Sequence, residues 1–155
     1  MTCWQPLENS SLTDNTIYHS TFPSRFDSLA EIAIFVRKAA YEAGLDDINV
    51  YSVETAVDEA CSNIIEHALH GDRNSSIDCT CQVNYLGITV ILNDHGKPFN
   101  PETIPPPNLD ASLEEREDHG LGLFFINKCM DEVHFEFDPI KGNTLTMRKF
   151  KTKIK

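Results

Sequence analysis

The sequence lacks the features that mark several large classes of protein. No run approaches the roughly 18 consecutive apolar residues of a membrane span, and the first residues show no basic stretch followed by an apolar core, as a secretory signal would. Lys and Arg number 13 against 24 Asp and Glu, which gives a formal net charge of -11. Because neither a signal nor a span is seen, we expect a cytoplasmic protein. The negative charge repels nucleic acid phosphates and anionic membranes, so we expect the protein to bind neither directly and to favour a basic protein partner.

Glycine, proline and paired cysteines are also scarce. With 7 Gly, 8 Pro and 41% hydrophobic residues in 155, the composition excludes a fibrous or disordered chain and predicts one domain with a real core. The five cysteines contain no Cys-x-x-Cys pair, so we expect them to be reduced and structural. A metal site in which Cys79 and Cys81 join His67 or His70 is an alternative, although zinc ligands usually show tighter paired spacing. No Walker A, Gly-x-Ser-x-Gly or zincin motif occurs.

What is present is an alternation of strand-like and helix-like periodicity. Strands are expected at 16–22, 76–84, 88–93, 134–137 and 144–150, and helices at 29–44, 50–69 and 121–133. The run Val90-Ile91-Leu92 is fully apolar, which indicates a central strand. This order predicts an α/β protein, a two-layer α/β sandwich in which helices cover one face of a mixed, mostly antiparallel sheet.

The chain divides into one domain with two tails. Residues 1–15 are polar and are expected to form a flexible N-terminal tail, residues 16–150 the domain, and residues 151–155 a C-terminal tail. Periodicity disappears around 97–119, where a run of three prolines precedes an acidic cluster. A loop of this length is often a lid or a binding segment, and the alternative is a solvated linker.

The second expected helix carries a polar row on one side. Glu59, Asn63 and His67 stand at i, i+4 and i+8 and therefore line up. An Asn amide oxygen suits Mg²⁺, which takes its other ligands from water and phosphates, and a carboxylate one turn away can accept a proton. The alternative is a solvent-facing helix with these residues by chance.

The second motif ends the apolar strand at 88–93. Asp94 there can accept a hydrogen bond from an exocyclic amino group, such as that of adenine, and Gly96 lets the backbone approach a ligand closely. A plain turn is the alternative.

The third motif is Gly120-Leu-Gly122-Leu123, at the expected start of a helix. Unpaired N–H groups and the positive end of the helix dipole make such a position a phosphate site, and glycines leave room for the approach. A glycine pair at a helix start is weak evidence alone, but here it follows the lid-like loop.

Together, Glu59-Ala-Cys-Ser-Asn63, Asp94-His-Gly96 and Gly120-Leu-Gly122-Leu123 resemble the three nucleotide-binding boxes of the histidine-kinase-like ATPase superfamily. Residues 56–67 and 130–133 are similar to the bacterial anti-sigma-factor serine/threonine kinases within it, and the similarity covers nearly the whole chain. The resemblance implies a Bergerat-type ATP-binding fold. It also implies a homodimeric kinase that uses ATP and Mg²⁺ to phosphorylate a STAS-domain anti-anti-sigma factor and that otherwise sequesters a sigma factor.

The resemblance assigns a role to each matching residue. Glu59 would be the general base, Asn63 the Mg²⁺ ligand, Asp94 with Gly96 the adenine reader, and Thr144 the residue that supports adenine recognition. The phosphates would bind at Gly120, Gly122 and Leu123. Pro98 replaces the second glycine of the family's Asp-x-Gly-x-Gly box. Arg116 is the lone cation between Lys97 and Lys128, and either turns inward to the phosphates or leaves an acidic surface for a basic partner. An ATP-binding module that acts by protein binding alone is the alternative function.

Overall fold

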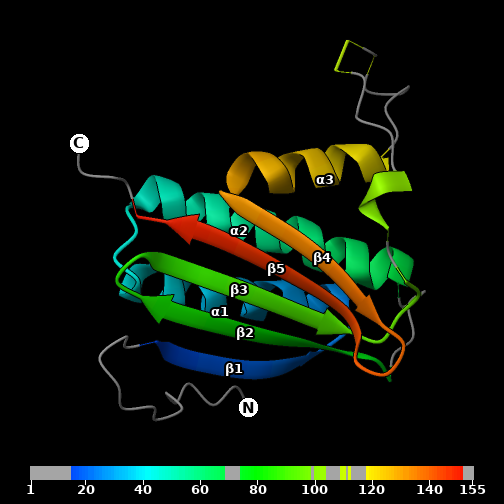
Figure 1. The fold of residues 1–155 in the computed structure, drawn as a ribbon, viewed down its shortest axis with the longest axis horizontal. Helices are drawn as coiled ribbons and strands as arrows, with labels where there is room; N and C mark the ends of the chain where they lie inside the picture. Colours follow the sequence, from blue (N-terminus) through cyan, green and yellow to red (C-terminus); the bar gives the residue numbers. More distant parts are fainter. Residues whose placement is uncertain are drawn as a thin grey trace.

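A five-stranded antiparallel sheet forms the scaffold of the molecule (Figure 1). The computed structural model describes residues 15–68, 74–98, 100–103, 109–110, 112 and 118–151. The strand order is β1-β2-β3-β5-β4, and each pairing is antiparallel. The strands are β1 (Thr16–Pro23), β2 (Ser76–Asn84), β3 (Gly87–Asp94), β4 (Glu132–Asp138) and β5 (Gly142–Phe150).

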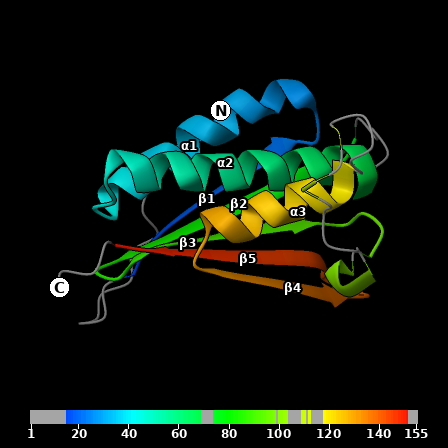
Figure 2. The ribbon, with the colours of Figure 1, turned by 90° about the horizontal axis from the view of Figure 1, so that it is seen from above.

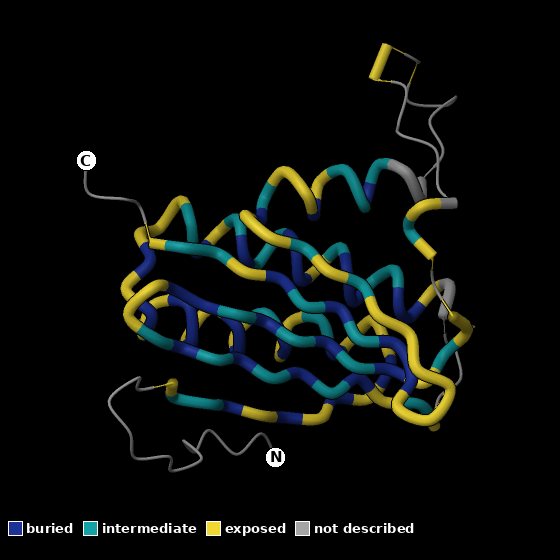
Figure 3. The backbone as a smooth tube through the Cα atoms, viewed as in Figure 1, coloured by how far each residue is buried: buried dark blue, intermediate teal, exposed yellow. Residues whose placement is uncertain are grey.

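Strict alternation along the strands gives the sheet one apolar face. In β2 and β3 every second side chain is buried, because successive residues of a strand point to opposite faces. Val90 and Leu92 of β3 are fully buried, which confirms the prediction that this strand is central. Figure 3 shows this alternation of buried and less buried positions along the sheet.

Three α-helices cover the apolar face (Figure 2). They are α1 (Leu29–Glu42), α2 (Asp47–Asn63) and α3 (Asp118–Cys129), and α2 packs between the other two. A π-helical turn (Ile64–Ala68) continues α2, and short 3-10 turns lie at Phe26–Ser28 and Pro101–Thr103. Within the described ranges, no helix has the length and apolar character needed to cross a bilayer.

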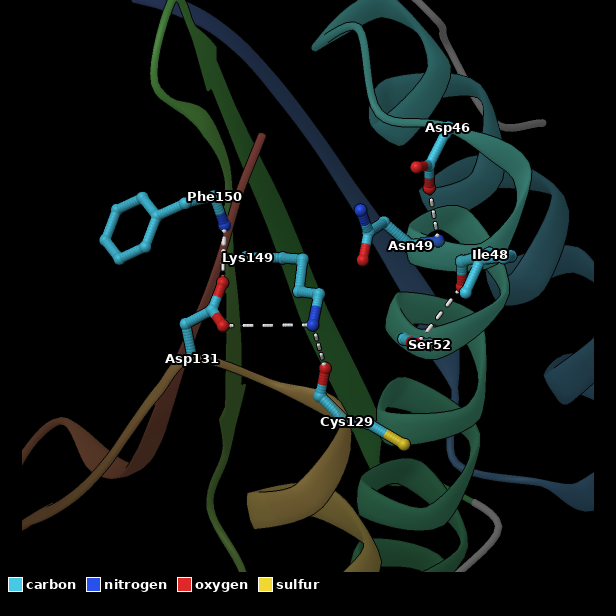
Figure 4. A network of polar contacts seen from close by, with 8 residues as sticks. All are labelled: Asp46, Ile48, Asn49, Ser52, Cys129, Asp131, Lys149 and Phe150. Carbon is cyan, nitrogen blue, oxygen red and sulfur yellow. Dashed lines mark hydrogen bonds and ion pairs between the residues drawn. The ribbon is translucent and has the colours of Figure 1, made fainter. Parts of the chain in front are cut away.

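Lys149 of β5 contacts the C-terminal end of α3 (Figure 4). Lys149, whose side chain is 13% exposed, donates from Nζ to the Cys129 carbonyl oxygen at 2.8 Å and lies 3.8 Å from the Asp131 carboxylate. Asp131 in turn accepts a hydrogen bond from the Phe150 amide at 2.8 Å. A cation at the negative end of the helix dipole stabilises that end, so this contact fixes where α3 stops.

The expected architecture is confirmed, with differences at element ends. The sheet is antiparallel at all described pairings rather than mixed. Helix α2 begins at Asp47 because the Asp46 side chain caps it, accepting a hydrogen bond from the Asn49 amide at 2.8 Å. The prediction that the third helix runs through Val133 is wrong. The Asp131 amide turns away to the Arg148 carbonyl of β5, and Val133 belongs to β4.

Candidate functional site

Helix α2 presents two polar side chains beside its buried stripe. Val57, Ala60 and Cys61 are buried in the core, as the apolar period predicts, whereas Glu59 and Asn63 are only partly buried. They stand one turn apart on the same side of the helix. His67 follows in the row, but its side chain lies outside the described residues.

The first glycine-rich turns of α3 lie directly against these two side chains. A Cβ placed on Gly122 would be 3.2 Å from Glu59 Oε2 and 3.3 and 3.6 Å from Asn63 Nδ2 and Oδ1. Because Gly122 has no side chain, no Cβ crowds the carboxylate and the amide. Residues from the first and the third motif are thus brought together, as the resemblance implies.

The surroundings of Glu59 alter its acidity. Burial raises the pKa of this carboxyl above its usual value of 4.5, and the neighbouring charges of Asp58 and Glu66 raise it further. A carboxylate whose pKa moves toward the working pH accepts a proton more effectively during a reaction. The environment of Glu59 therefore suits a general base.

Asp94 lies at the end of β3 with its carboxylate buried, at 4% exposure. Its Oδ1 accepts a hydrogen bond from the Gly96 amide at 2.9 Å and one from Asn143 Nδ2 at 3.1 Å. The charge of Asp94 also reaches α2. Burial raises the pKa of the Cys61 thiol well above its usual value, and the charges of Cys79, Asp58 and Asp94 add to this rise.

Thr144 does not join this group. Asn93 Nδ2 donates to Thr144 Oγ1 at 2.6 Å, and the two residues are opposite one another in the β3–β5 register. Asp94 and Asn143, the next pair in that register, are buried and bond to each other. Because neighbouring residues of a strand face opposite sides of the sheet, the Thr144 hydroxyl lies on the face away from Asp94.

The other expected site residues are placed only in part. Gly120 lies in the first turn of α3, within the segment whose amide groups lack helical partners, and α3 begins at Asp118, three residues before the expected 121. Leu123 follows Gly122 and is half-buried. Arg116 lies outside the described residues, as do most of the expected lid and the two tails.

Two residues of the site were missed by sequence reasoning. Asn143 bonds to Asp94, and Gly142 has a φ of +84° with its ideal Cβ position 2.3 Å from the Asp94 carbonyl oxygen. A glycine after a lysine looks like an ordinary turn in the sequence, so only the strand register reveals that β5 meets Asp94 here.

The described residues give no support to the alternative metal site at Cys79 and Cys81. Among the described residues, no group of three or more His, Cys, Asp or Glu side chains is arranged to hold a metal ion. Cys79 and Cys81 are buried free thiols. His67 and His70 fall outside this finding, because their side chains are not described.

The donor set suits a magnesium-bound nucleoside triphosphate. An amide oxygen at Asn63 is a hard neutral ligand, and Mg²⁺ commonly binds few protein groups and takes further oxygens from phosphates. Any side chain at position 122 would crowd both Glu59 and Asn63, and glycine avoids this. Asp94 supplies a buried acceptor for a base with an amino group.

Comparison with known proteins agrees with this geometry. The model of the histidine kinase-like ATPase domain matches residues 22–149. The serine-protein kinase RsbW of Halalkalibacterium halodurans is 27% identical over 134 residues, which cover 84% of this chain and 80% of that protein. The protein of the same name from Bacillus licheniformis is 26% identical over 133 residues, covering 83% and 81%.

A solved structure shares the fold. The crystal structure of the RsbU and RsbW domains of a Mycobacterium tuberculosis protein aligns with a TM-score of 0.56 and 14% sequence identity, over 88% of this chain. The chain spans about a third (33%) of that longer chain, and at this low sequence identity the similarity shows the fold alone. With the family model matched over most of the sequence, the chain belongs to the histidine kinase-like ATPase family.

Proposed function

We propose that the chain is an ATP-dependent serine/threonine protein kinase that acts as an anti-sigma factor. Its substrate is a STAS-domain anti-anti-sigma factor, and its second partner is a sigma factor that it sequesters. The related proteins named serine-protein kinase RsbW support this assignment over most of both chains. The chain acts in the cytoplasm as a homodimer and binds neither nucleic acid nor a membrane directly.

The observation that carries the proposal is the contact between the two helices. Gly122 of α3 faces both side chains: a Cβ added to it would lie 3.2 Å from the Glu59 carboxylate and 3.3 Å from the Asn63 amide. A binding module needs a metal ligand and a phosphate site but no base. A carboxylate with a raised pKa beside them is what a transfer to a hydroxyl group requires.

Each residue then has one task. Glu59 accepts the proton of the attacking serine or threonine hydroxyl, and Asn63 holds Mg²⁺. Gly120, Gly122 and Leu123 contribute the start of α3, where backbone N–H groups bind phosphate oxygens. Asp94, with Gly96, recognises adenine, and Arg116 contacts the terminal phosphate. When bound, Mg²⁺ neutralises phosphate charge.

A second function rests on the same pocket. An ATP-binding module that acts by protein binding alone would keep Asp94 and Asn63 and would transfer nothing. The acidic composition, with a net charge of -11, favours a basic protein partner in either case.

Transfer of label separates the two functions. The protein is mixed with Mg²⁺, ATP labelled at the γ-phosphate and a STAS protein encoded beside it. A kinase places label on a serine or threonine of the STAS protein. If ATP binds and the STAS protein forms a complex but stays unlabelled, the chain is a binding module.

A further inference from the structure

The Asn143 side chain bonds to the Asp94 carboxylate and to the backbone that follows Asp94. Its Nδ2 lies 3.1 Å from Asp94 Oδ1, 2.9 Å from the Lys97 carbonyl oxygen and 3.3 Å from the Gly96 carbonyl oxygen. Asn143 is itself buried, at 9% exposure. One amide nitrogen therefore connects the carboxylate to the backbone turn that follows it.

The strand register explains why this contact forms. Asp94 and Asn143 are partners at the end of the β3–β5 pairing, and both face the helical layer. Gly142, just before Asn143, adopts a φ of +84° and comes so close to Asp94 that an added Cβ would lie 2.3 Å from its carbonyl oxygen. Only glycine fits at this approach, so the position of the Asn143 side chain is built into the backbone.

The direction of the contact matters for recognition. Among the described residues, both hydrogen bonds to the Asp94 carboxylate fall on Oδ1, from Gly96 and Asn143. A buried carboxylate without such donors would rotate or draw in water, because its charge needs partners. With Oδ1 occupied, Oδ2 is the oxygen left to accept a hydrogen bond from a ligand.

We propose that Asn143 is a positioning residue that sets the preference of this site for a base with a 6-amino group. It holds the Asp94 carboxylate in one orientation and fixes the Gly96–Lys97 backbone beside it. This inference rests on the proposed function, since it takes Asp94 as the adenine reader. It assigns to Asn143 the support of adenine recognition that sequence reasoning gave to Thr144, whose hydroxyl faces the other side of the sheet.

The test compares ATP with inosine triphosphate, which carries an oxygen in place of the 6-amino group. Calorimetry with Mg²⁺ measures both affinities for the wild type and for Asn143→Ala. We expect the affinity for ATP to fall roughly tenfold, the effect of weakening one hydrogen bond to a charged acceptor. The affinity for inosine triphosphate should not change, so the ratio of the ATP affinity to the inosine triphosphate affinity should also fall roughly tenfold.

Controls separate positioning from general damage. Tyr18→Phe removes the hydroxyl that bonds to Glu42 at the opposite edge of the sheet and should leave the ratio at its wild-type value. Asn143→Ser, which leaves a smaller cavity, replaces the alanine variant if that fails to fold. An equal loss of both affinities, or no loss, would overturn the assignment of Asn143. Failure of the wild type to bind ATP would instead overturn the proposed function.

Discussion

Replacing Gly122 by Ala tests the contact between α3 and α2 with one methyl group. The added Cβ would lie 3.2 Å from Glu59 Oε2 and 3.3 Å from Asn63 Nδ2, so the two side chains must move by a few tenths of an ångström. Gly122 lies inside α3 without a positive φ, so the substitution imposes no backbone strain. Alanine in a helix interior is favoured over glycine by roughly 0.5–1 kcal/mol.

The gain in helix propensity should maintain or raise stability, whereas the crowding of Glu59 and Asn63 should lower activity. We expect Gly122→Ala to melt at the wild-type temperature or slightly above it. Mg²⁺ requires near-ideal geometry at about 2.0–2.1 Å from its ligands, so a displaced Asn63 should bind the metal poorly. Because a displacement of about 1 Å can cost roughly 100-fold, we expect a loss of roughly tenfold in kcat/KM.

The assay pairs thermal melting with steady-state phosphate transfer and calorimetry of Mg²⁺-ATP. Asn127→Ala is the matched control, because it also raises helix propensity in α3 but changes an exposed residue away from Glu59. Full activity in Gly122→Ala would refute the reasoning that this glycine keeps the site open. A large fall in melting temperature would show instead that the packing of α3 against α2 had been misjudged.

Asp94→Asn should weaken ATP binding by roughly 10- to 100-fold, since an amide can present a donor where the adenine amino group needs an acceptor; equal ATP affinity in calorimetry would exclude Asp94 as the reader. Lys149→Met keeps the aliphatic stem but removes the contact with the Cys129 carbonyl, so denaturant unfolding should show a loss of about 1–2 kcal/mol; an unchanged midpoint would mean that this contact does not stabilise α3. Glu59→Gln should have a higher melting temperature than the wild type at neutral pH. The pKa of Glu59 is raised in the folded protein, so the ionised carboxylate lowers the free energy of unfolding. This destabilisation is absent well below pH 4.5 and complete above the pKa of the folded state. The gain should therefore vanish in acid, and a lower melting temperature at neutral pH would contradict it.

The helices and strands of the two layers could be predicted from periodicity, because each pattern depends on residues that are close together in the sequence. The alternation in β2 and the apolar run in β3 each depend only on neighbouring residues, and both appear in the structure as expected. The end of α3 could not be read this way. Apolar residues recur at helical spacing at Ile126, Met130 and Val133, so the sequence does not mark the end. The helix stops where the Asp131 amide donates to the Arg148 carbonyl and Lys149 of β5 binds the Cys129 carbonyl, and both partners lie far along the sequence.

The site was likewise predictable where it depends on neighbouring residues and not where it depends on contacts between distant segments. Glu59 and Asn63 stand one turn apart in any helix, so their shared side follows from spacing alone. Their contact with Gly122 depends on how α3 packs on α2, which the motifs predict only through resemblance. The choice between Thr144 and Asn143 depends on strand register, since a shift of one residue turns a side chain to the other face. The structure places the Thr144 hydroxyl on the face opposite Asp94, and the sequence alone does not give this register.

The central claim is that Glu59 is the base of a kinase site. The most direct measurement follows transfer of the γ-phosphate to the STAS protein by the wild type and by Glu59→Gln, with ATP affinity measured on the same samples. Glu54→Gln serves as the control, because Glu54 lies on α2 but pairs with Arg37. We predict a loss of roughly 10²–10⁴ in turnover for Glu59→Gln, with ATP affinity retained and the control fully active. Transfer by Glu59→Gln at the wild-type rate would contradict the account.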